Sequence, residues 1–167
     1  MTRLQQIIRT LELQPHPEGG FFRETYRSAG WIARESLDPG YQGARNYSTC
    51  IYFLLTSEVF SAWHRIRQDE IWHFYDGSAI ELHVIAEDGS YAKTVIGRDI
   101  AQGQVPQFVV AGGSWFAATV IDREAYALLG CTVAPGFDFL DFELPTRAEL
   151  TGKFPHHRAW IERLTRD

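Results

Sequence analysis

The sequence predicts an all-β domain in which short antiparallel strands form a sandwich, jelly roll or barrel, with a short helix near each end. Short runs rich in Val, Ile, Tyr, Phe and Thr follow one another at fairly regular spacing from Phe21 onward, separated by turn residues. Aromatic residues make up 14% of the chain, a share that suits pleated, half-buried surfaces. No long helical pattern separates the runs, which argues against a parallel βαβ sheet.

The strand boundaries follow from the turn residues between these runs. Asp76-Gly77 and Asp88-Gly89 are strong hairpin signals, because glycine tolerates the positive φ that tight turns require. Many evenly spaced strands favour a closed or two-layered β architecture. The strands are expected near residues 21–28, 46–55, 59–66, 69–76, 79–86, 91–97, 105–110, 115–121, 125–133 and 139–143.

Both ends of the chain carry helical patterns. Apolar residues at helical spacing predict a helix over residues 2–12, which Pro15 and Pro17 end. Thr146 and Glu149 fit a capping box, and apolar spacing predicts a last helix over 156–165. We find no internal repeat or linker, so we expect a single domain over residues 1–167.

Composition and charge exclude several classes of protein. Acidic residues outnumber basic ones by 21 to 16, and no basic cluster suggests a nucleic-acid-binding face. No apolar run approaches the roughly 20 residues needed to span a membrane, and the N-terminus does not resemble a signal peptide. Cys50 and Cys131 lie inside apolar runs, which predicts buried thiols in a cytoplasmic protein.

A histidine and a glutamate stand on faces that should otherwise be apolar. In the run from Phe60 to Ile66, alternation places His64 on the inward face. In the next run Glu70 shares a face with Trp72 and Phe74. If the two strands pair as a hairpin, His64 and Glu70 face one interior. A histidine and a carboxylate in an aromatic-lined cavity are typical parts of a metal site or of acid–base catalysis.

Structural roles for these residues remain open at this point. A single inward histidine is often a satisfied core residue, and Glu70 is structural if Arg23 or Arg45 pairs with it. His73 faces the opposite side from Glu70 unless a bulge turns it inward. For His83 we favour a structural role. The histidines in loop or helix-start positions are expected to be solvated: His16, His156 and His157.

These residues resemble a known pattern. The spacing of His64, Glu70 and Gly77 is similar to the first cupin motif, and the segment 111–116 resembles the second. The whole chain also resembles the uncharacterised cupin-5 family, through the segments 16–28, 61–77 and 129–139. The resemblance implies a double-stranded β-helix, the cupin jelly-roll barrel, with short N- and C-terminal helices.

The departures from the cupin motifs bear on metal binding. Metal-binding cupins use three histidines and one glutamate, whereas Ile66 and Phe116 stand at two of the histidine positions. Neither side chain can ligate, and two protein ligands rarely hold a catalytic metal. No cofactor is therefore expected, and His64 and Glu70 would hold a divalent metal only weakly. A site completed by His73 or His83 would need a special strand bend.

The resemblance implies a small-molecule ligand inside the barrel. Cupins without metal include sugar epimerases, so one expectation is a metal-independent isomerase or epimerase acting on a sugar-like or carbonyl metabolite, with His64 as base and Glu70 orienting it or acting as acid. The alternatives are a non-catalytic binding or sensor protein and a metal-dependent enzyme. Arg23 is expected to hold a substrate anion, and the remaining ligand-binding candidates are Tyr26, Tyr52, Trp72, His73, Phe74 and Phe116.

A homodimer is also expected. Jelly rolls leave sheet edges and outer faces that need cover. The outward face at His73 and Tyr75, together with the apolar strand near 46–55, provides material for an interface. The resemblance to cupins, which commonly pair, implies the same. Neither nucleic acid nor a membrane is expected as a partner.

Overall fold

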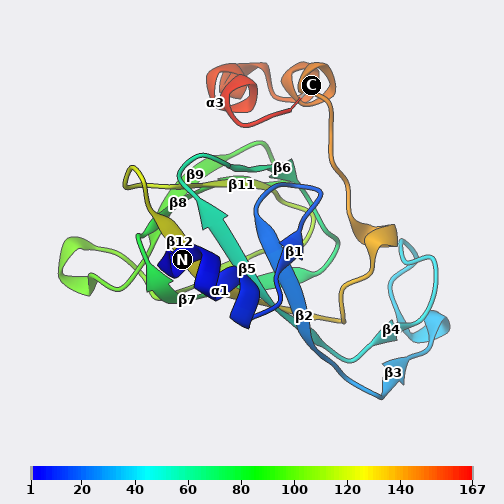
Figure 1. Cartoon of the computed structure of the whole chain (residues 1–167). Coiled ribbons are helices and arrows are strands. Elements are labelled where there is room, and N and C mark those ends of the chain that lie inside the picture. The colour runs from blue at the N-terminus through cyan, green and yellow to red at the C-terminus, as the bar shows by residue number, and fades with distance from the viewer. Residues whose placement is uncertain (1, 167) are drawn as a thin grey trace.

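Two facing antiparallel sheets form the body of the protein in the computed structural model, which describes residues 2–166 (Figure 1). The larger sheet has the order β1 (Gln14–Pro15), β2 (Phe21–Arg27), β5 (Thr49–Thr56), β12 (Tyr126–Ala134), β7 (Asp69–Gly77) and β10 (Gln107–Val110). The smaller sheet has the order β6 (Ser61–His64), β11 (Trp115–Val120), β8 (Ile80–Ile85) and β9 (Tyr91–Ile96). A separate pair joins β3 (Trp31–Ile32) to β4 (Arg45–Asn46). This architecture confirms the predicted jelly-roll barrel.

The turn after β7 lies at a predicted boundary, but the hairpin expected at Asp76-Gly77 is not formed, because β7 and β8 belong to different sheets. The hairpin expected at Asp88-Gly89 is formed, since β8 pairs with β9. Gly77 has a φ of 95°, and a Cβ there would come within 2.1 Å of the carbonyl oxygen of Tyr126. Only glycine fits both the angle and the space. The chain therefore leaves the larger sheet at Gly77 and enters β8 of the smaller one. The short strands β1, β3 and β4 have too few residues to show an alternating pattern and were not expected.

Two apolar cores hold the layers together. The first lies between the sheets and includes Phe53, Trp72 and Phe116, each at most 2% exposed. The second lies between the smaller sheet and the C-terminal helices, where Trp63 packs near Ile161. Figure 1 shows these helices on the side of the smaller sheet that faces away from the larger one. The C-terminal helices therefore cover the outer face of the smaller sheet. The internal cavity described below is lined by residues of the larger sheet together with others such as His64 and Ile66.

Threonine capping boxes begin two of the terminal helices. α1 (Arg3–Thr10) is capped by Thr2, and Arg3 binds Asp76 of β7 at 2.7 Å. Thr146 and Glu149 form the predicted capping box of α2 (Arg147–Lys153), which is followed by α3 (Arg158–Arg163). Short 3-10 turns occupy Arg34–Ser36, Ile100–Gln102, Phe139–Asp141 and Pro155–His157. Within residues 2–166, no helix has the length and apolar character that crossing a membrane would take.

The strand predicted over 139–143 is wrong. The segment instead forms the 3-10 turn η3 (Phe139–Asp141), because the side chain of Asp138 accepts a hydrogen bond from the backbone N–H of Leu140 at 2.9 Å. Such local capping competes with strand pairing. The aromatic residues of this segment turn toward the cavity described next.

Candidate functional site

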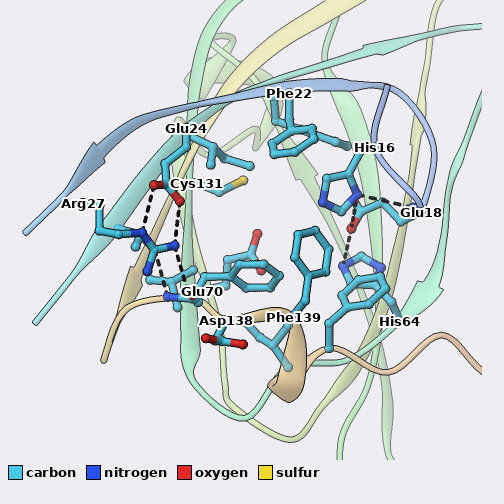
Figure 2. Close-up of a pocket in the computed structure, with 17 residues that line it drawn as sticks. His16, Glu18, Phe22, Glu24, Arg27, His64, Glu70, Cys131, Asp138 and Phe139 are labelled. Carbon is cyan, nitrogen blue, oxygen red and sulfur yellow. Dashed lines mark hydrogen bonds and ion pairs between the residues drawn. The ribbon is translucent and has the colours of Figure 1, made fainter. Parts of the chain in front are cut away.

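A cavity of about 260 Å³ lies inside the barrel. Figure 2 shows a polar end formed by His16, Glu18 and His64, and an opposite side that carries Glu24, Arg27 and Asp138. Apolar side chains, most of them aromatic, form much of the wall between the two: Phe22, Ile51, Phe53, Ile66, Val133, Phe137, Phe139 and Phe142. Thr49, Glu70 and Cys131 complete the lining.

His64 ends β6 with both ring nitrogens engaged. Its side chain is 2% exposed, and Nδ1 lies 2.7 Å from the carbonyl oxygen of Ala62. Because a carbonyl oxygen can only accept, Nδ1 carries a proton. Nε2 lies 3.0 Å from Oε2 of Glu18. Two lone pairs would repel at this distance, so a proton lies between the imidazole and the carboxyl group.

Burial determines which partner of this pair holds the proton. It raises the pKa of the Glu18 carboxyl and lowers the pKa of the His64 imidazole, since a charge is poorly solvated in the interior. Both effects favour a neutral carboxylic acid beside a neutral imidazole. Glu18 therefore donates to Nε2 of His64, while the hydroxyl of Ser61 donates to Oε1 of Glu18 at 2.8 Å.

The turn between β1 and β2 brings Glu18 to this position. Gly19 and Gly20 follow it with φ angles of 118° and 73°, and a Cβ on Gly20 would lie 2.6 Å from the carbonyl oxygen of Leu54. The backbone carbonyl of Glu18 accepts from the N–H of Ala62 at 2.9 Å, which fastens the turn to β6. The two glycines thus let the chain reverse closely enough for the carboxyl group to reach His64.

His16 lies in the cavity wall, so the expectation that it is solvated is wrong. Its side chain is only 7% exposed and packs edge-on against Phe22, with ring centroids 4.6 Å apart. Nδ1 lies 3.3 Å from the backbone N–H of Glu18, which can only donate, so the neutral ring carries its proton on Nε2. Burial lowers the pKa of His16 and keeps the ring neutral. Figure 2 shows the ring directed toward the cavity.

Glu70 places a second carboxyl group in the same cavity. It is 8% exposed, and burial raises its pKa to about 7. Among the described residues, neither Arg23 nor Arg45 pairs with it, because Arg23 binds Glu12 and Arg45 binds Asp141. Glu70 is therefore divided between its neutral and ionised forms near neutral pH.

His64 and Glu70 reach the cavity from opposite sheets. The hairpin expected between their strands is not formed, because β6 pairs with β11 whereas β7 pairs with β12 and β10. Both residues nevertheless line the cavity, on the inward faces that the alternation predicts. Their charges interact, since an ionised Glu70 raises the pKa of His64.

The other side of the cavity contains a closed ion pair. Arg27 donates to both carboxylate oxygens of Glu24, at 2.9 and 2.7 Å, and further to Asn46 and to the carbonyl of Phe137. The hydrogen bonds from Arg27 to Glu24 raise the pKa of Arg27, and the charge of the nearby Asp138 raises it further. The guanidinium group is therefore largely occupied by protein acceptors.

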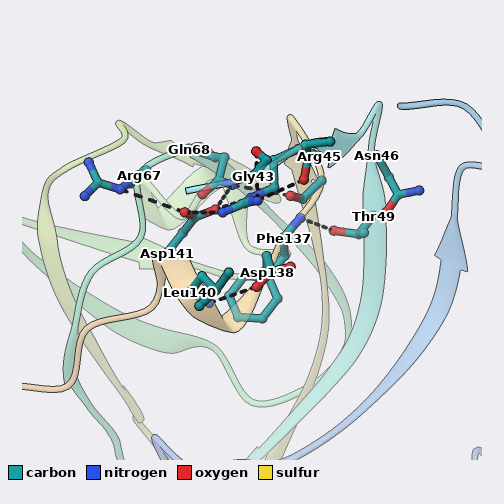
Figure 3. A network of polar contacts seen from close by, with 12 residues as sticks. Gly43, Arg45, Asn46, Thr49, Arg67, Gln68, Phe137, Asp138, Leu140 and Asp141 are labelled. Carbon is teal, nitrogen blue, oxygen red and sulfur yellow. Dashed lines mark hydrogen bonds and ion pairs between the residues drawn. The ribbon is translucent and has the colours of Figure 1, made fainter. Parts of the chain in front are cut away.

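A buried polar network anchors the aromatic segment 136–142 (Figure 3). Both oxygens of Asp141 accept from Arg45, at 2.7 and 2.8 Å, and Gln68 donates to the same carboxylate at 2.7 Å. The backbone N–H of Phe137 also donates to the hydroxyl of Thr49 at 2.9 Å. The network thus holds the segment that brings Phe137, Phe139 and Phe142 to the cavity.

The other predicted ligand-binding residues lie outside the cavity lining. Phe116 packs behind His64, with ring centroids 4.1 Å apart, and Trp72 and Phe74 pack in the first core. Their roles toward a ligand stay predictions, and the contact of Phe116 with His64 shows how it shapes the site indirectly.

The remaining candidates lie on the outer side of the larger sheet. His73 lies 3.1 Å from the hydroxyl of Thr132, because the bulge in β7 falls after it, at Tyr75, and does not turn it inward. Tyr52 packs against Tyr75, with ring centroids 6.2 Å apart. Tyr26 is 55% exposed, and Arg23 pairs with Glu12 at 2.9 Å.

The residues at the cupin metal positions do not fit a metal ion. Ile66 lines the cavity, and Phe116 packs behind His64. His83 lies among Glu81, Tyr91 and Trp160, away from the cavity. Within the described part of the chain, no three or more His, Cys, Asp or Glu side chains are grouped as metal ligands.

We predict that His64 stays neutral below the ordinary histidine pKa, because burial disfavours the imidazolium ion. Long-range ¹H–¹⁵N NMR spectra recorded as the pH is lowered should show a single tautomer, protonated at Nδ1. A His64 ring that becomes doubly protonated at the ordinary histidine pKa of about 6.5 would contradict the prediction.

Together, the fold and the cavity define a jelly-roll barrel of the cupin class. Residues 5–145 match the family described as Cupin superfamily (DUF985), and the chain belongs to this family. It is 34% identical over 146 residues to the uncharacterized protein YML079W of Saccharomyces cerevisiae, covering 83% of this chain and 73% of the yeast protein. The resemblance to the cupin-5 family is thereby confirmed.

Solved structures show the same similarity. A hypothetical protein from Leishmania major superposes with a TM-score of 0.90 at 35% identity, covering 99% of this chain and 100% of the other. Protein SO0799 from Shewanella oneidensis gives 0.87 at 37% identity, covering 99% of both chains. Oxalate decarboxylase from Bacillus subtilis gives 0.55 at 11% identity, covering 90% of this chain and 36% of the enzyme, and shares the fold alone.

Proposed function

We propose that the chain is a metal-independent enzyme of the isomerase or epimerase type, which moves a proton on a small molecule bound in the barrel. The observation that carries the proposal is Glu70, a carboxyl group of the cavity wall whose pKa is raised to about 7 by burial. A general acid or base works best when its pKa lies near the working pH. Carboxyl groups with perturbed pKa values in a cleft are typical of acid–base sites.

Glu70 and His16 divide the work in this proposal. Glu70 removes a proton from the carbon next to a carbonyl group and returns it to the same or a neighbouring position. His16 donates from Nε2 to the carbonyl oxygen, where negative charge develops when the proton leaves. Proton abstraction and return balance without any further reactant.

His64 acts as a positioning residue in this scheme. Its two nitrogens are occupied by Ala62 and Glu18, so it reaches a ligand only through Glu18. The neutral Glu18–His64 pair supplies a mobile proton to the cavity that Glu70 also lines. This differs from the expectation that His64 itself is the base.

Solvent deuterium exchange tests the proposal. Carbonyl compounds that raise the melting temperature would be incubated with the protein in D₂O, and deuterium at the carbon next to the carbonyl followed by NMR. We expect exchange with the wild type and at least about 100-fold slower exchange with Glu70→Gln, the lower end of the range for a general base.

The matched control is Glu58→Gln, which makes the same chemical change at an exposed residue outside the cavity lining and should exchange at the wild-type rate. Compounds that bind but never exchange would instead support the second candidate, a non-catalytic binding or sensor protein.

A further inference from the structure

The charge balance of the cavity narrows the chemistry of its ligand. Four carboxyl groups line it, those of Glu18, Glu24, Glu70 and Asp138, whereas Arg27 is the one Arg or Lys in the lining formed by residues 2–166. Arg27 donates four hydrogen bonds to protein acceptors, two of them to Glu24. An anionic ligand would therefore find no free cation in the cavity.

The acidic groups are not equivalent. Glu24 is neutralised by Arg27, and Glu18 shares a proton with His64. Glu70 is 8% exposed and, within the described residues, has no Arg or Lys partner. A positively charged group of a ligand beside Glu70 would supply the counter-charge that the described protein residues do not provide. The attraction between opposite charges is strong where water is excluded.

The walls suit a cation as well. Five phenylalanines line the cavity: Phe22, Phe53, Phe137, Phe139 and Phe142. Phe139 and Phe142 approach with ring centroids 5.9 Å apart at a steep angle, and Phe137 meets Phe139 at 5.0 Å. Aromatic faces set at angles to one another attract alkylammonium groups through the negative charge of their π systems.

We propose that the cavity selects a small organic cation, an amine or quaternary ammonium compound with an apolar body, and rejects carboxylates and phosphates. This proposal rests on the proposed function in one respect, because it concerns the same cavity. It adds the chemical class of the substrate. It also replaces the expectation that Arg23 holds a substrate anion, because Arg23 pairs with Glu12 outside the cavity.

Three probes of nearly the same shape test the charge preference: choline, its neutral carbon isostere dimethylbutanol, and the anion dimethylbutanoate. Calorimetric titration above pH 7 should give affinities at least about tenfold higher for choline than for the alcohol, as a desolvated cation–π contact with a nearby carboxylate provides. The anion should bind more weakly than either.

Two variants distinguish the contribution of the Glu70 carboxylate to binding from the contribution of the cavity shape. Glu70→Gln should reduce the preference for choline over dimethylbutanol by about tenfold and leave the affinity for the alcohol unchanged. Glu58→Gln, outside the cavity lining, should keep the wild-type preference. Equal or tighter binding of the alcohol or the anion, or an unchanged preference in Glu70→Gln, would overturn the proposal.

The two proposals fail separately. Deuterium exchange on a neutral carbonyl compound, without any preference for cations, would leave the proton-transfer proposal standing and remove the substrate class. A cation preference without exchange on any amine-bearing carbonyl compound would keep the substrate class and make the protein a binding module.

Discussion

Replacing Asp141 by leucine should lower the free energy of unfolding by about 3–5 kcal/mol, the usual effect of removing one partner from a buried ion pair. The Asp141 side chain is 1% exposed and that of Arg45 is 2% exposed. Without Asp141, the guanidinium group of Arg45 remains buried without a counter-charge, and Gln68 loses its acceptor. Urea unfolding of the two proteins measures the difference.

A double variant distinguishes the buried charge from the loss of packing. Arg45→Met combined with Asp141→Leu removes both charges and should recover most of the lost stability, because apolar replacement of a whole buried pair is often neutral. If Asp141→Leu alone lost less than about 1 kcal/mol, the pair would behave like an exposed surface pair and the prediction would fail.

The same variant should affect the cavity. Asp141 anchors the segment that carries Phe137, Phe139 and Phe142 into the wall (Figure 3). Releasing this anchor should weaken the binding of choline even under conditions where the variant remains folded. The network thus connects the stability of the fold with the shape of the site.

The alternation of apolar residues and the turn signals predict most of the larger strands correctly. β7 and β8 agree with the predicted runs to within a residue because Gly77 ends the one strand and the inward positions of both are apolar. The segment 139–143 was predicted wrongly because its aromatic residues look like a strand when read alone. The capping bond from Leu140 to Asp138 is a side-chain contact that the apolar pattern does not contain.

The site was predictable only in part for a similar reason. His64 and Glu70 stand out because each interrupts an apolar face within its own strand. Glu18 meets His64 across 46 positions of the chain, and nothing local requires that meeting. The one local signal for Glu18 is its position directly before Gly19 and Gly20. The turn at these two glycines leaves no space for a Cβ atom, so it holds the preceding acidic residue in a fixed place.

The second large effect expected concerns Glu70 and pH. Its pKa is about 7 in the folded protein and 4.5 in an ordinary environment. Below pH 4.5 the carboxyl group is protonated in both the folded and the unfolded chain. As the pH rises from 4.5 to 7, the unfolded chain releases the proton while the folded chain retains it, so this group lowers the free energy of unfolding. The difference in pKa corresponds to about 3 kcal/mol.

Glu70→Gln should remove this loss, because glutamine has nearly the same shape and does not ionise. The gain in stability over the wild type should therefore grow by about 2.5 kcal/mol between about pH 5 and about pH 8. Urea unfolding at both pH values measures it, with Glu58→Gln as a control that should follow the wild type. A gain that does not change with pH would mean that Glu70 ionises normally in the folded protein. A pH-dependent gain, combined with lost proton exchange, would show that the fold retains an acid that destabilises it, the usual relation between an active site and stability.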